Sequence, residues 1–164
     1  MAPTDPAPTD PVPTPGGGAA AADEPREVAV VRAFLASLEL LDVERALGYL
    51  ADDVAYTNVS TPTVHGRENV RRVLGGFLRF TSGFEAVNHH VAADGAVVLT
   101  ERTDAFTLGR LRVQFWVCGR FEVRDGKIAV WRDHFDWVNV TVGVARGLAG
   151  LVVPSLRARI PAGR

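Results

Sequence analysis

The spacing of apolar residues separates a mainly helical first part of the chain from a second part built of strands. From Glu27 onward, apolar residues recur three and four positions apart, which predicts a helix with one apolar stripe. Asp42 is a suitable N-cap for a short second helix over residues 43–50, and Gly66 precedes a third helix. The stripe of the first helix comprises Val28, Val31, Phe34, Leu35, Leu38 and Leu41, and that of the third comprises Val70, Val73, Leu74, Phe77 and Leu78.

Beyond the third helix the apolar period changes from about four to two, which indicates strands. Asp94-Gly95 and Asp125-Gly126 are strong signals of β-hairpin turns, and Gly109-Arg110 joins a further pair. The order helix, helix, strand, helix and then a four-stranded meander predicts an α+β fold. In it, a curved antiparallel sheet wraps around the N-terminal helices and forms a cone with an internal pocket. The expected strands cover residues 54–59, 84–92, 96–108, 111–124 and 127–138.

The 164 residues suffice for one folded domain with a substantial core. Residues 1–25 are rich in Pro, Thr, Gly and Ala and predict a disordered leader, followed by a cone domain over 26–152 and a loose end over 153–164. The apolar stretch near the C-terminus is interrupted by Arg146, several glycines and Pro154, so we expect no membrane span. The first residues lack a basic segment followed by an apolar run, and the expected location is therefore cytoplasmic.

The charge pattern and the cysteine count exclude several classes of function. A net charge of −1 gives no reason to expect nucleic acid or an anionic membrane surface as a partner. Cys118 is the only cysteine, which excludes an internal disulfide and offers no metal-binding spacing, so we interpret it as a small buried residue. His89 and His90 should point to opposite faces of a strand and would be poor joint ligands. We therefore expect no metal and no cofactor.

Polar side chains occupy strand positions at which the alternation predicts core residues. Tyr56 and Asn58 share one strand face, and so do Arg102 and Asp104. Asp133 lies within an aromatic segment, on the face that should be buried. Burying such groups is costly unless they satisfy one another, and their three strands belong to one predicted sheet. A convergent polar cluster inside an apolar cavity is therefore expected.

The charges of this cluster favour acid–base chemistry. Two carboxylates in a low-dielectric pocket disfavour double ionisation, so one of Asp104 and Asp133 should hold a proton near neutral pH. Arg102 stays charged and can bridge both acids with its planar set of donors. Tyr56 and Asn58 could hold a water molecule beside the ionised carboxylate. An activated water opposite a proton donor suits hydrolytic ring opening.

Each residue also has an ordinary structural interpretation. Arg102 and Asp104 could form an exposed ion pair, and Asp133 could be a structural buried acid. Tyr56 could be a core residue with its hydroxyl at the rim, and Asn58 could stabilise a turn. These interpretations would have to hold together for all five residues to remove the catalytic hypothesis.

The set Tyr56-x-Asn58, Arg102-x-Asp104 and Asp133 in Trp-Arg-Asp-His-Phe-Asp-Trp resembles the limonene-1,2-epoxide hydrolase family. The resemblance covers about residues 26–150, and the family shares the cone fold of nuclear transport factor 2 and ketosteroid isomerase. It implies that Asp133 is the base that activates water and that Tyr56 and Asn58 position this water. It further implies that Asp104 is the acid that protonates the epoxide oxygen and that Arg102 bridges the two aspartates.

The resemblance implies a cofactor-independent epoxide hydrolase that converts an apolar terpene-, lipid- or sterol-like epoxide and water to a vicinal diol. Apolar side chains on the same strands are the expected pocket walls. Two alternatives stay open: an isomerase or epoxide-opening cyclase of the same fold, and a non-catalytic lipid-binding module. We also expect a homodimer, since a broad curved sheet often leaves an apolar outer face. The candidate wall residues are Trp131, Phe135, Phe106 and Leu108.

Overall fold

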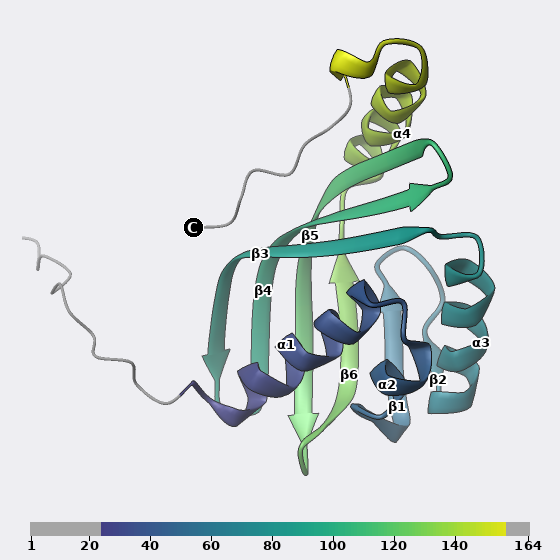
Figure 1. The fold of residues 1–164 in the computed structure, drawn as a ribbon. Helices are drawn as coiled ribbons and strands as arrows, with labels where there is room; N and C mark the ends of the chain where they lie inside the picture. Colours follow the sequence, from purple (N-terminus) through teal and green to yellow (C-terminus); the bar gives the residue numbers. More distant parts are fainter. Residues whose placement is uncertain (1–23, 157–164) are drawn as a thin grey trace, which may run out of the picture.

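The computed structural model describes residues 24–156 and has one curved six-stranded sheet with four α-helices (Figure 1). The predicted α+β fold is confirmed. The helices are α1 (Arg26–Glu39), α2 (Val43–Leu47), α3 (Arg67–Leu78) and α4 (Trp137–Val152), followed by the 3₁₀ turn η1 (Pro154–Leu156). The strands are β1 (Leu50–Asn58), β2 (Val64–His65), β3 (Gly83–Asp94), β4 (Val97–Leu108), β5 (Leu111–Arg124) and β6 (Lys127–His134).

The sheet has the order β2-β1-β6-β5-β4-β3, so the last four strands form a meander and β1 joins it beside β6. The pair β1–β6 is parallel and the other pairs are antiparallel. The sheet curves around α1, while α3 lies on the β1–β2 side (Figure 1). Residues of this concave side line a cavity together with residues of α1 and α3.

The apolar stripe of α1 packs onto the concave face of the sheet. Phe34 lies at the centre of this contact, fully buried. Its ring is edge-on to Trp131 on β6, with 4.9 Å between the ring centroids, and also contacts Phe121 on β5 at 6.3 Å. Burial of such aromatic rings contributes area and a preferred ring geometry, so this cluster fixes α1 across the central strands.

Two helices end earlier than the apolar spacing predicts. The first helix ends at Glu39, and Leu41 follows in the left-handed region at φ 57° while still packing against the core. The second helix begins as predicted, with the Asp42 side chain accepting a hydrogen bond from the Arg45 backbone N–H at 3.0 Å. It ends at Leu47 rather than near residue 50, because Leu50 already pairs with Ile128 as the start of β1.

The last predicted strand is too long, because β6 ends at His134 and does not continue to residue 138. Asp136 begins α4 as its N-cap, and its carboxylate accepts a hydrogen bond from the backbone N–H of Val138 at 2.8 Å. Alternating aromatic residues extend the strand pattern beyond its true end. The chain nevertheless begins a helix here, because the Asp136 side chain satisfies a backbone N–H of the first helical turn.

Helix α4 takes the place of a neighbouring strand along the part of β5 that β6 does not reach. The Asn139 side chain accepts a hydrogen bond from the Trp116 backbone N–H at 3.0 Å. Gly143 and Gly147 face the backbone carbonyls of Gln114 and Arg112 so closely that a Cβ atom at either glycine would overlap them. The glycines therefore permit a helix to cover a strand edge.

The prediction that His89 and His90 point to opposite faces of a strand is wrong. A bulge in β3 lies between Asn88 and His90, and it places both imidazoles against residues of the outer face of β4. His89 pairs with Thr103 at 2.8 Å, and His90 lies 3.8 Å from the Glu101 carboxylate.

Cys118 is only partly buried, on the outer side of β5 rather than in the core. The leader predicted over residues 1–25 and the loose end predicted over 153–164 fall largely outside the described residues. Within the described part of the chain, no helix has the length and apolar character needed to cross a membrane.

Candidate active site

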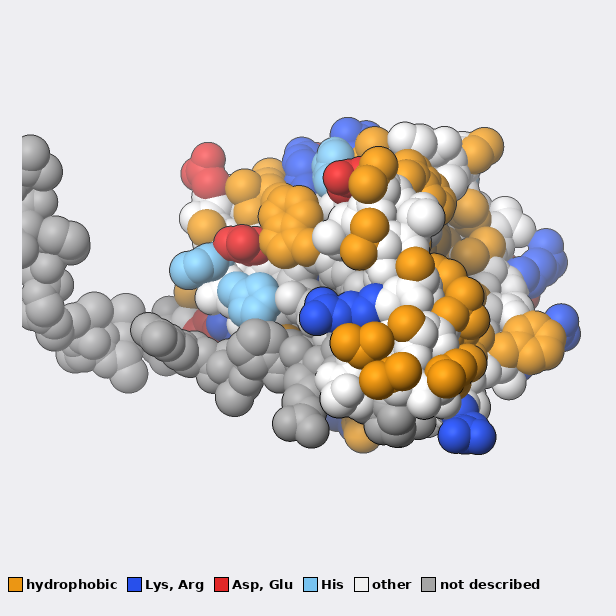
Figure 2. Space-filling view, turned by 90° about the horizontal axis from the view of Figure 1, so that it is seen from above, with side chains coloured by type: hydrophobic (Ala, Val, Ile, Leu, Met, Phe, Trp, Pro, Cys, Tyr) orange, Lys and Arg blue, Asp and Glu red, His pale blue; other side chains and the backbone are white. Residues whose placement is uncertain are grey.

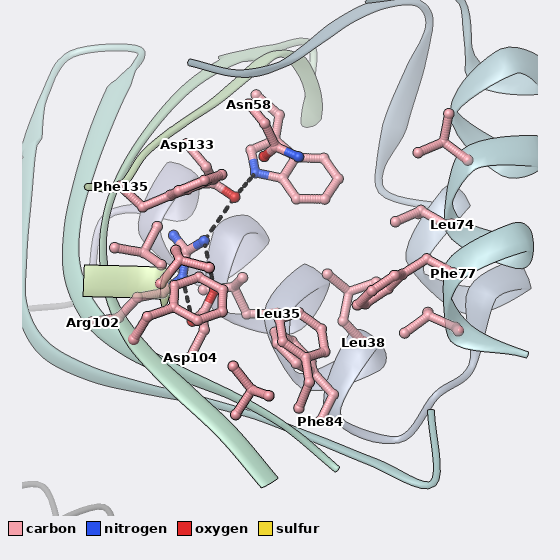
Figure 3. Close-up of a pocket in the computed structure, with 18 of the residues that line it drawn as sticks. Leu35, Leu38, Asn58, Leu74, Phe77, Phe84, Arg102, Asp104, Asp133 and Phe135 are labelled. Carbon is pink, nitrogen blue, oxygen red and sulfur yellow. Dashed lines mark hydrogen bonds and ion pairs between the residues drawn. The ribbon is translucent and has the colours of Figure 1, made fainter. Parts of the chain in front are cut away.

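A cavity of about 400 Å³ lies between the concave face of the sheet, α1, α3 and the start of α4 (Figure 3). All five polar residues predicted for the site line it, and so do the four predicted wall residues. The polar groups gather on the sheet side, while apolar residues of α1 and α3 face them across the cavity (Figure 3). The predicted residues are Tyr56, Asn58, Arg102, Asp104 and Asp133, with Trp131, Phe135, Phe106 and Leu108 in the walls.

The strand order explains how distant parts of the sequence meet. Asn58 at the end of β1 is the parallel neighbour of Asp133 on β6. Arg102 and Asp104 lie on β4, separated from β6 by the single strand β5. Because residues two apart share a strand face, each pair presents both side chains to the same side. Three sequence segments therefore supply one site.

Arg102 bridges the two aspartates (Figure 3). Its Nε donates to Oδ1 of Asp104 at 2.8 Å, and its Nη2 donates to Oδ2 of the same carboxyl at 3.2 Å. The same Nη2 lies 2.8 Å from Oδ2 of Asp133. The Arg102 residue is 1% exposed and both aspartates are 5% exposed, so the three groups form a buried ionic cluster and not a surface ion pair.

The two carboxyl oxygens of Asp133 have different surroundings. Oδ2 accepts hydrogen bonds from Arg102 and from the indole N–H of Trp131, the latter at 2.9 Å. Oδ1 is buried and has no hydrogen-bond partner among the described residues. A buried carboxylate oxygen without a donor is costly, so this atom is the one prepared to bind a donor from the cavity.

Tyr56 and Asn58 lie on β1 beside Asp133. The Asn58 amide donates to the Tyr56 hydroxyl at 2.8 Å. The Tyr56 ring stacks on the indole of Trp131, with 3.9 Å between the ring centroids. The contact with Asn58 uses the tyrosine oxygen as an acceptor, so its proton is free to be donated to a third group near Asp133.

Burial shifts the acid–base properties of the cluster. It raises the pKa of Asp104 to about 6, a shift that the nearby Arg102 guanidinium opposes and the charges of Asp133 and Glu39 reinforce. Burial likewise raises the pKa of Tyr56 well above its ordinary value, reinforced by the charge of Asp133. For Arg102, desolvation favours the neutral form, but the two carboxylates prevail and raise its pKa further. Asp104 is therefore a group that can hold a proton near neutral pH.

The helices supply much of the apolar lining, which the strand pattern could not reveal. On α1 and α3 the helical spacing marks a buried stripe but does not tell core positions from cavity positions. The aromatic walls on the strands form a connected group, in which Phe106 contacts both Phe84 and Phe115. The further lining residues comprise Leu35, Leu38, Val73, Leu74, Phe77, Leu78, Phe84, Val113, Phe115, Val117, Trp137 and Val140.

The site can perform coupled proton transfers. It combines an unpartnered carboxyl oxygen on Asp133, a carboxyl group of raised pKa on Asp104 and the Arg102 guanidinium between them. One shared proton makes this set neutral, which suits a buried environment. No three His, Cys, Asp or Glu side chains in residues 24–156 are grouped closely enough to hold a metal ion.

The comparisons with known proteins point to one family. The profile of the limonene-1,2-epoxide hydrolase catalytic domain matches residues 25–146. The epoxide hydrolase EphG of Mycobacterium tuberculosis is 48% identical over 130 residues, which span 79% of this chain and 87% of that protein. The solved structure of an M. tuberculosis LEH-like epoxide hydrolase is 46% identical with a TM-score of 0.78, covering 82% of this chain and 96% of the other.

More distant structures share the fold. One is an NTF2-like protein of unknown function from Burkholderia pseudomallei, with a TM-score of 0.66 and 16% identity. The match covers 74% of this chain and 98% of that protein. At this identity the similarity concerns the cone architecture alone.

Proposed function

The chain belongs to the limonene-1,2-epoxide hydrolase family and is an epoxide hydrolase, and we propose that it opens an apolar epoxide in one step without a cofactor. In this proposal water attacks an epoxide carbon directly, and no covalent bond to the protein forms. The observation that carries the proposal is the bridge from Arg102 to both aspartates, with Oδ1 of Asp133 left for a new donor.

In the proposed reaction Asp133 is the base. A water molecule donates one proton to Oδ1 of Asp133 while its oxygen forms a bond to an epoxide carbon. Tyr56 and Asn58 lie on β1, next to the strand of Asp133, and in this proposal their side chains hold the water in line for attack. Holding a nucleophile in a productive position converts a bimolecular step into an effectively unimolecular one.

Asp104 is the proposed acid. As the carbon–oxygen bond of the ring breaks, the leaving oxygen takes the proton of Asp104, so no free alkoxide forms in the apolar cavity. After the reaction Asp133 holds a proton and Asp104 is ionised. Return of that proton to Asp104 regenerates the site, and the net reaction is epoxide plus water to diol. Arg102 stabilises whichever carboxylate is charged at each stage.

The cavity supports an apolar substrate of the terpene, lipid or sterol kind. Among the described residues that line it, the polar side chains lie on the sheet side, and the others are aromatic or aliphatic. A substrate that carried further polar groups would leave them without hydrogen-bond partners there. The epoxide ring is therefore placed at the aspartates, with the hydrocarbon body along Phe77 and Phe106.

A labelling experiment tests the single step. A panel of limonene-1,2-epoxide and bulkier lipophilic epoxides would be offered in ¹⁸O-water under single-turnover conditions, and the products analysed by mass spectrometry. We expect vicinal diols that carry the label in the first turnover. Label that appears first in the protein would reject direct attack by water. Tight binding of the panel without turnover would instead favour the lipid-binding module, and a rearranged or cyclised product would favour the isomerase or cyclase.

A homodimer is the proposed assembly, and helix α4 supports it. Its exposed residues include Val138, Val142, Leu148 and Val152, which have more than half of their surface accessible. Figure 2, seen from the end where α4 lies, shows hydrophobic side chains gathered on this face. The outer face of the sheet, expected to be apolar, carries polar residues such as Thr103. Light scattering should give twice the monomer mass, with Leu148→Glu reducing it, and a monomeric wild type would contradict the proposal.

The proposed location is the cytoplasm. Cell fractionation of the tagged full chain would test it.

A further inference from the structure

The bridge between the aspartates spans an entire strand. Arg102 lies on β4 and Asp133 lies on β6, and β5 runs between them. In the register of the sheet, Gly119 of β5 is the partner of Asp133 on one side and of Thr100 on the other. The guanidinium therefore reaches Asp133 by lying across β5 at Gly119.

Gly119 provides the space for this crossing. A Cβ atom built there would overlap Nη1 of Arg102, and it would lie 2.6 Å from Oγ1 of Thr100 and 2.9 Å from Cε2 of Phe121. The backbone of Gly119 does not lie in the left-handed region, so no turn or strain requires glycine. Glycine is needed here because a side chain would occupy the space that the Arg102 guanidinium fills.

Thr100 supplies the remaining partner of the guanidinium. Its hydroxyl accepts a hydrogen bond from Nη1 of Arg102 at 3.1 Å, and the residue is 2% exposed. Nε and Nη2 are held by the aspartates, so this contact satisfies the third nitrogen. The contacts of Nε and Nη2 with the carboxyl groups already restrict the planar guanidinium, and the contact of Nη1 with Thr100 restricts its orientation further.

We propose that Gly119 and Thr100 are positioning residues for catalysis: the glycine admits the Arg102 guanidinium across β5, and the threonine hydroxyl fixes its orientation toward both aspartates. This inference rests on the proposed function. Neither residue touches the substrate, since neither lines the cavity. Their effect reaches the reaction through the orientation of Arg102, which holds Oδ2 of Asp133, while Oδ1 has no hydrogen-bond partner among the described residues.

The proposal has a consequence for the proton donor. The charged and titratable groups around Asp104 are Arg102 on its own strand, Asp133 on β6, Tyr56 on β1 and Glu39 on α1. Of these, only Arg102 favours the Asp104 carboxylate. A guanidinium that loses its fixed orientation stabilises this carboxylate less, so the pKa of Asp104 should rise further.

The decisive variants are Thr100→Val and Thr100→Ser, measured on limonene-1,2-epoxide with the full chain. Valine keeps the branched shape of the threonine side chain but lacks the hydroxyl that accepts the hydrogen bond from Arg102, whereas serine keeps this hydroxyl. We expect Thr100→Val to lower kcat about 10-fold to 100-fold with KM changed by less than about 3-fold, and Thr100→Ser to stay within about 3-fold of wild type. The alkaline fall of the pH–rate profile should move to higher pH in Thr100→Val. Equal losses in both variants, or an unmoved profile, would overturn the proposal.

Gly119→Ala tests the crossing itself, with Gly76→Ala as its matched control, since a Cβ atom at Gly76 meets nothing within 4 Å. We expect a loss of at least about 100-fold in kcat for Gly119→Ala and no loss for Gly76→Ala. Near-UV circular dichroism checks that each variant folds. If Gly119→Ala does not fold, the two Thr100 variants decide. A folded Gly119→Ala enzyme with wild-type kcat would contradict the assigned role.

One measurement separates this proposal from the proposed function. Titration of the Asp104 carboxyl carbon by ¹³C NMR requires no turnover. A higher Asp104 pKa in Thr100→Val than in wild type supports the positioning role even if limonene-1,2-epoxide is not hydrolysed, in which case the proposed function alone fails. Identical titration curves in the two proteins would reject the positioning role whatever the activity.

Discussion

The indole N–H of Trp131 donates a hydrogen bond to Oδ2 of Asp133, two residues further along the same strand, at 2.9 Å. Trp131 is therefore more than the apolar wall that the sequence predicts. Together with Arg102 it occupies Oδ2, while Oδ1 has no hydrogen-bond partner among the described residues. The proposed base thus has a defined reactive atom.

Replacing Trp131 by phenylalanine should lower kcat by about 10-fold, because a donor to a buried carboxylate contributes roughly 1.5–3 kcal/mol and its loss lets the carboxyl rotate. The phenyl ring can retain contacts with Phe34 and Tyr56. Steady-state kinetics on a hydrolysed epoxide would measure the change. Trp116→Phe, on the exposed outer face, is the control and should keep its activity. A fully active Trp131→Phe enzyme would show that the hydrogen bond does not orient Asp133.

Asp133→Asn and Asp104→Asn should each reduce turnover by about 10³-fold or more, because each removes a proton-transfer group that contributes roughly 10²- to 10⁴-fold. Diol formation followed by gas chromatography gives the rates, and circular dichroism verifies the fold. Asp53→Asn is a suitable control, since Asp53 is exposed and pairs with Arg124 away from the cavity. Near-normal rates in either site variant would remove that residue from its proposed role.

The rate should fall as pH rises above about 6. Burial raises the pKa of Asp104 to about 6, and only the protonated form can donate to the epoxide oxygen. Well above this pKa, each further pH unit should lower kcat/KM about tenfold. A pH–rate profile measured with wild type tests this dependence. A rate that stays constant up to about pH 9 would exclude Asp104 as the acid.

The same shift has a consequence for stability. The pKa of Asp104 is raised in the folded protein, from 3.8 to about 6, so the native state keeps a proton that the unfolded chain has lost. Its contribution to the free energy of unfolding is therefore complete below pH 3.8 and is lost as pH rises to about 6. Urea unfolding across this window should show wild type losing stability relative to Asp104→Asn. A pH-independent difference between the two proteins would contradict the raised pKa.

Gly143→Ala should destabilise the protein by about 1–3 kcal/mol, because its methyl group would overlap the Gln114 carbonyl and push α4 away from β5. Val140 and Trp137 of α4 line the cavity, so KM should rise as well. Thermal unfolding and steady-state kinetics measure the two effects. Gly76→Ala serves as control, since it adds a methyl group to a helix in open space. Equal stability of the two variants would show that α4 does not need a close approach to β5.

The apolar period of the chain could show that Arg102 and Asp104 share one face of their strand and that Tyr56 and Asn58 share one face of theirs, because alternation along a strand is a local property. The same pattern failed after His134, where the Asp136 cap decides between strand and helix. Periodicity records which faces are apolar but does not record where one element ends.

The sequence by itself determined the α+β architecture and the polar residues that belong inside it, because hydrophobic period, turn chemistry and residue type are all local. Only the tertiary structure decided that the Arg102 guanidinium crosses β5 over Gly119 and that Nη1 of Arg102 donates a hydrogen bond to the Thr100 hydroxyl. It also decided which carboxyl oxygen of Asp133 has no hydrogen-bond partner among the described residues. The physical reason is that these contacts depend on the register and curvature of non-adjacent strands. Packing of the whole chain sets these, and no short segment encodes them.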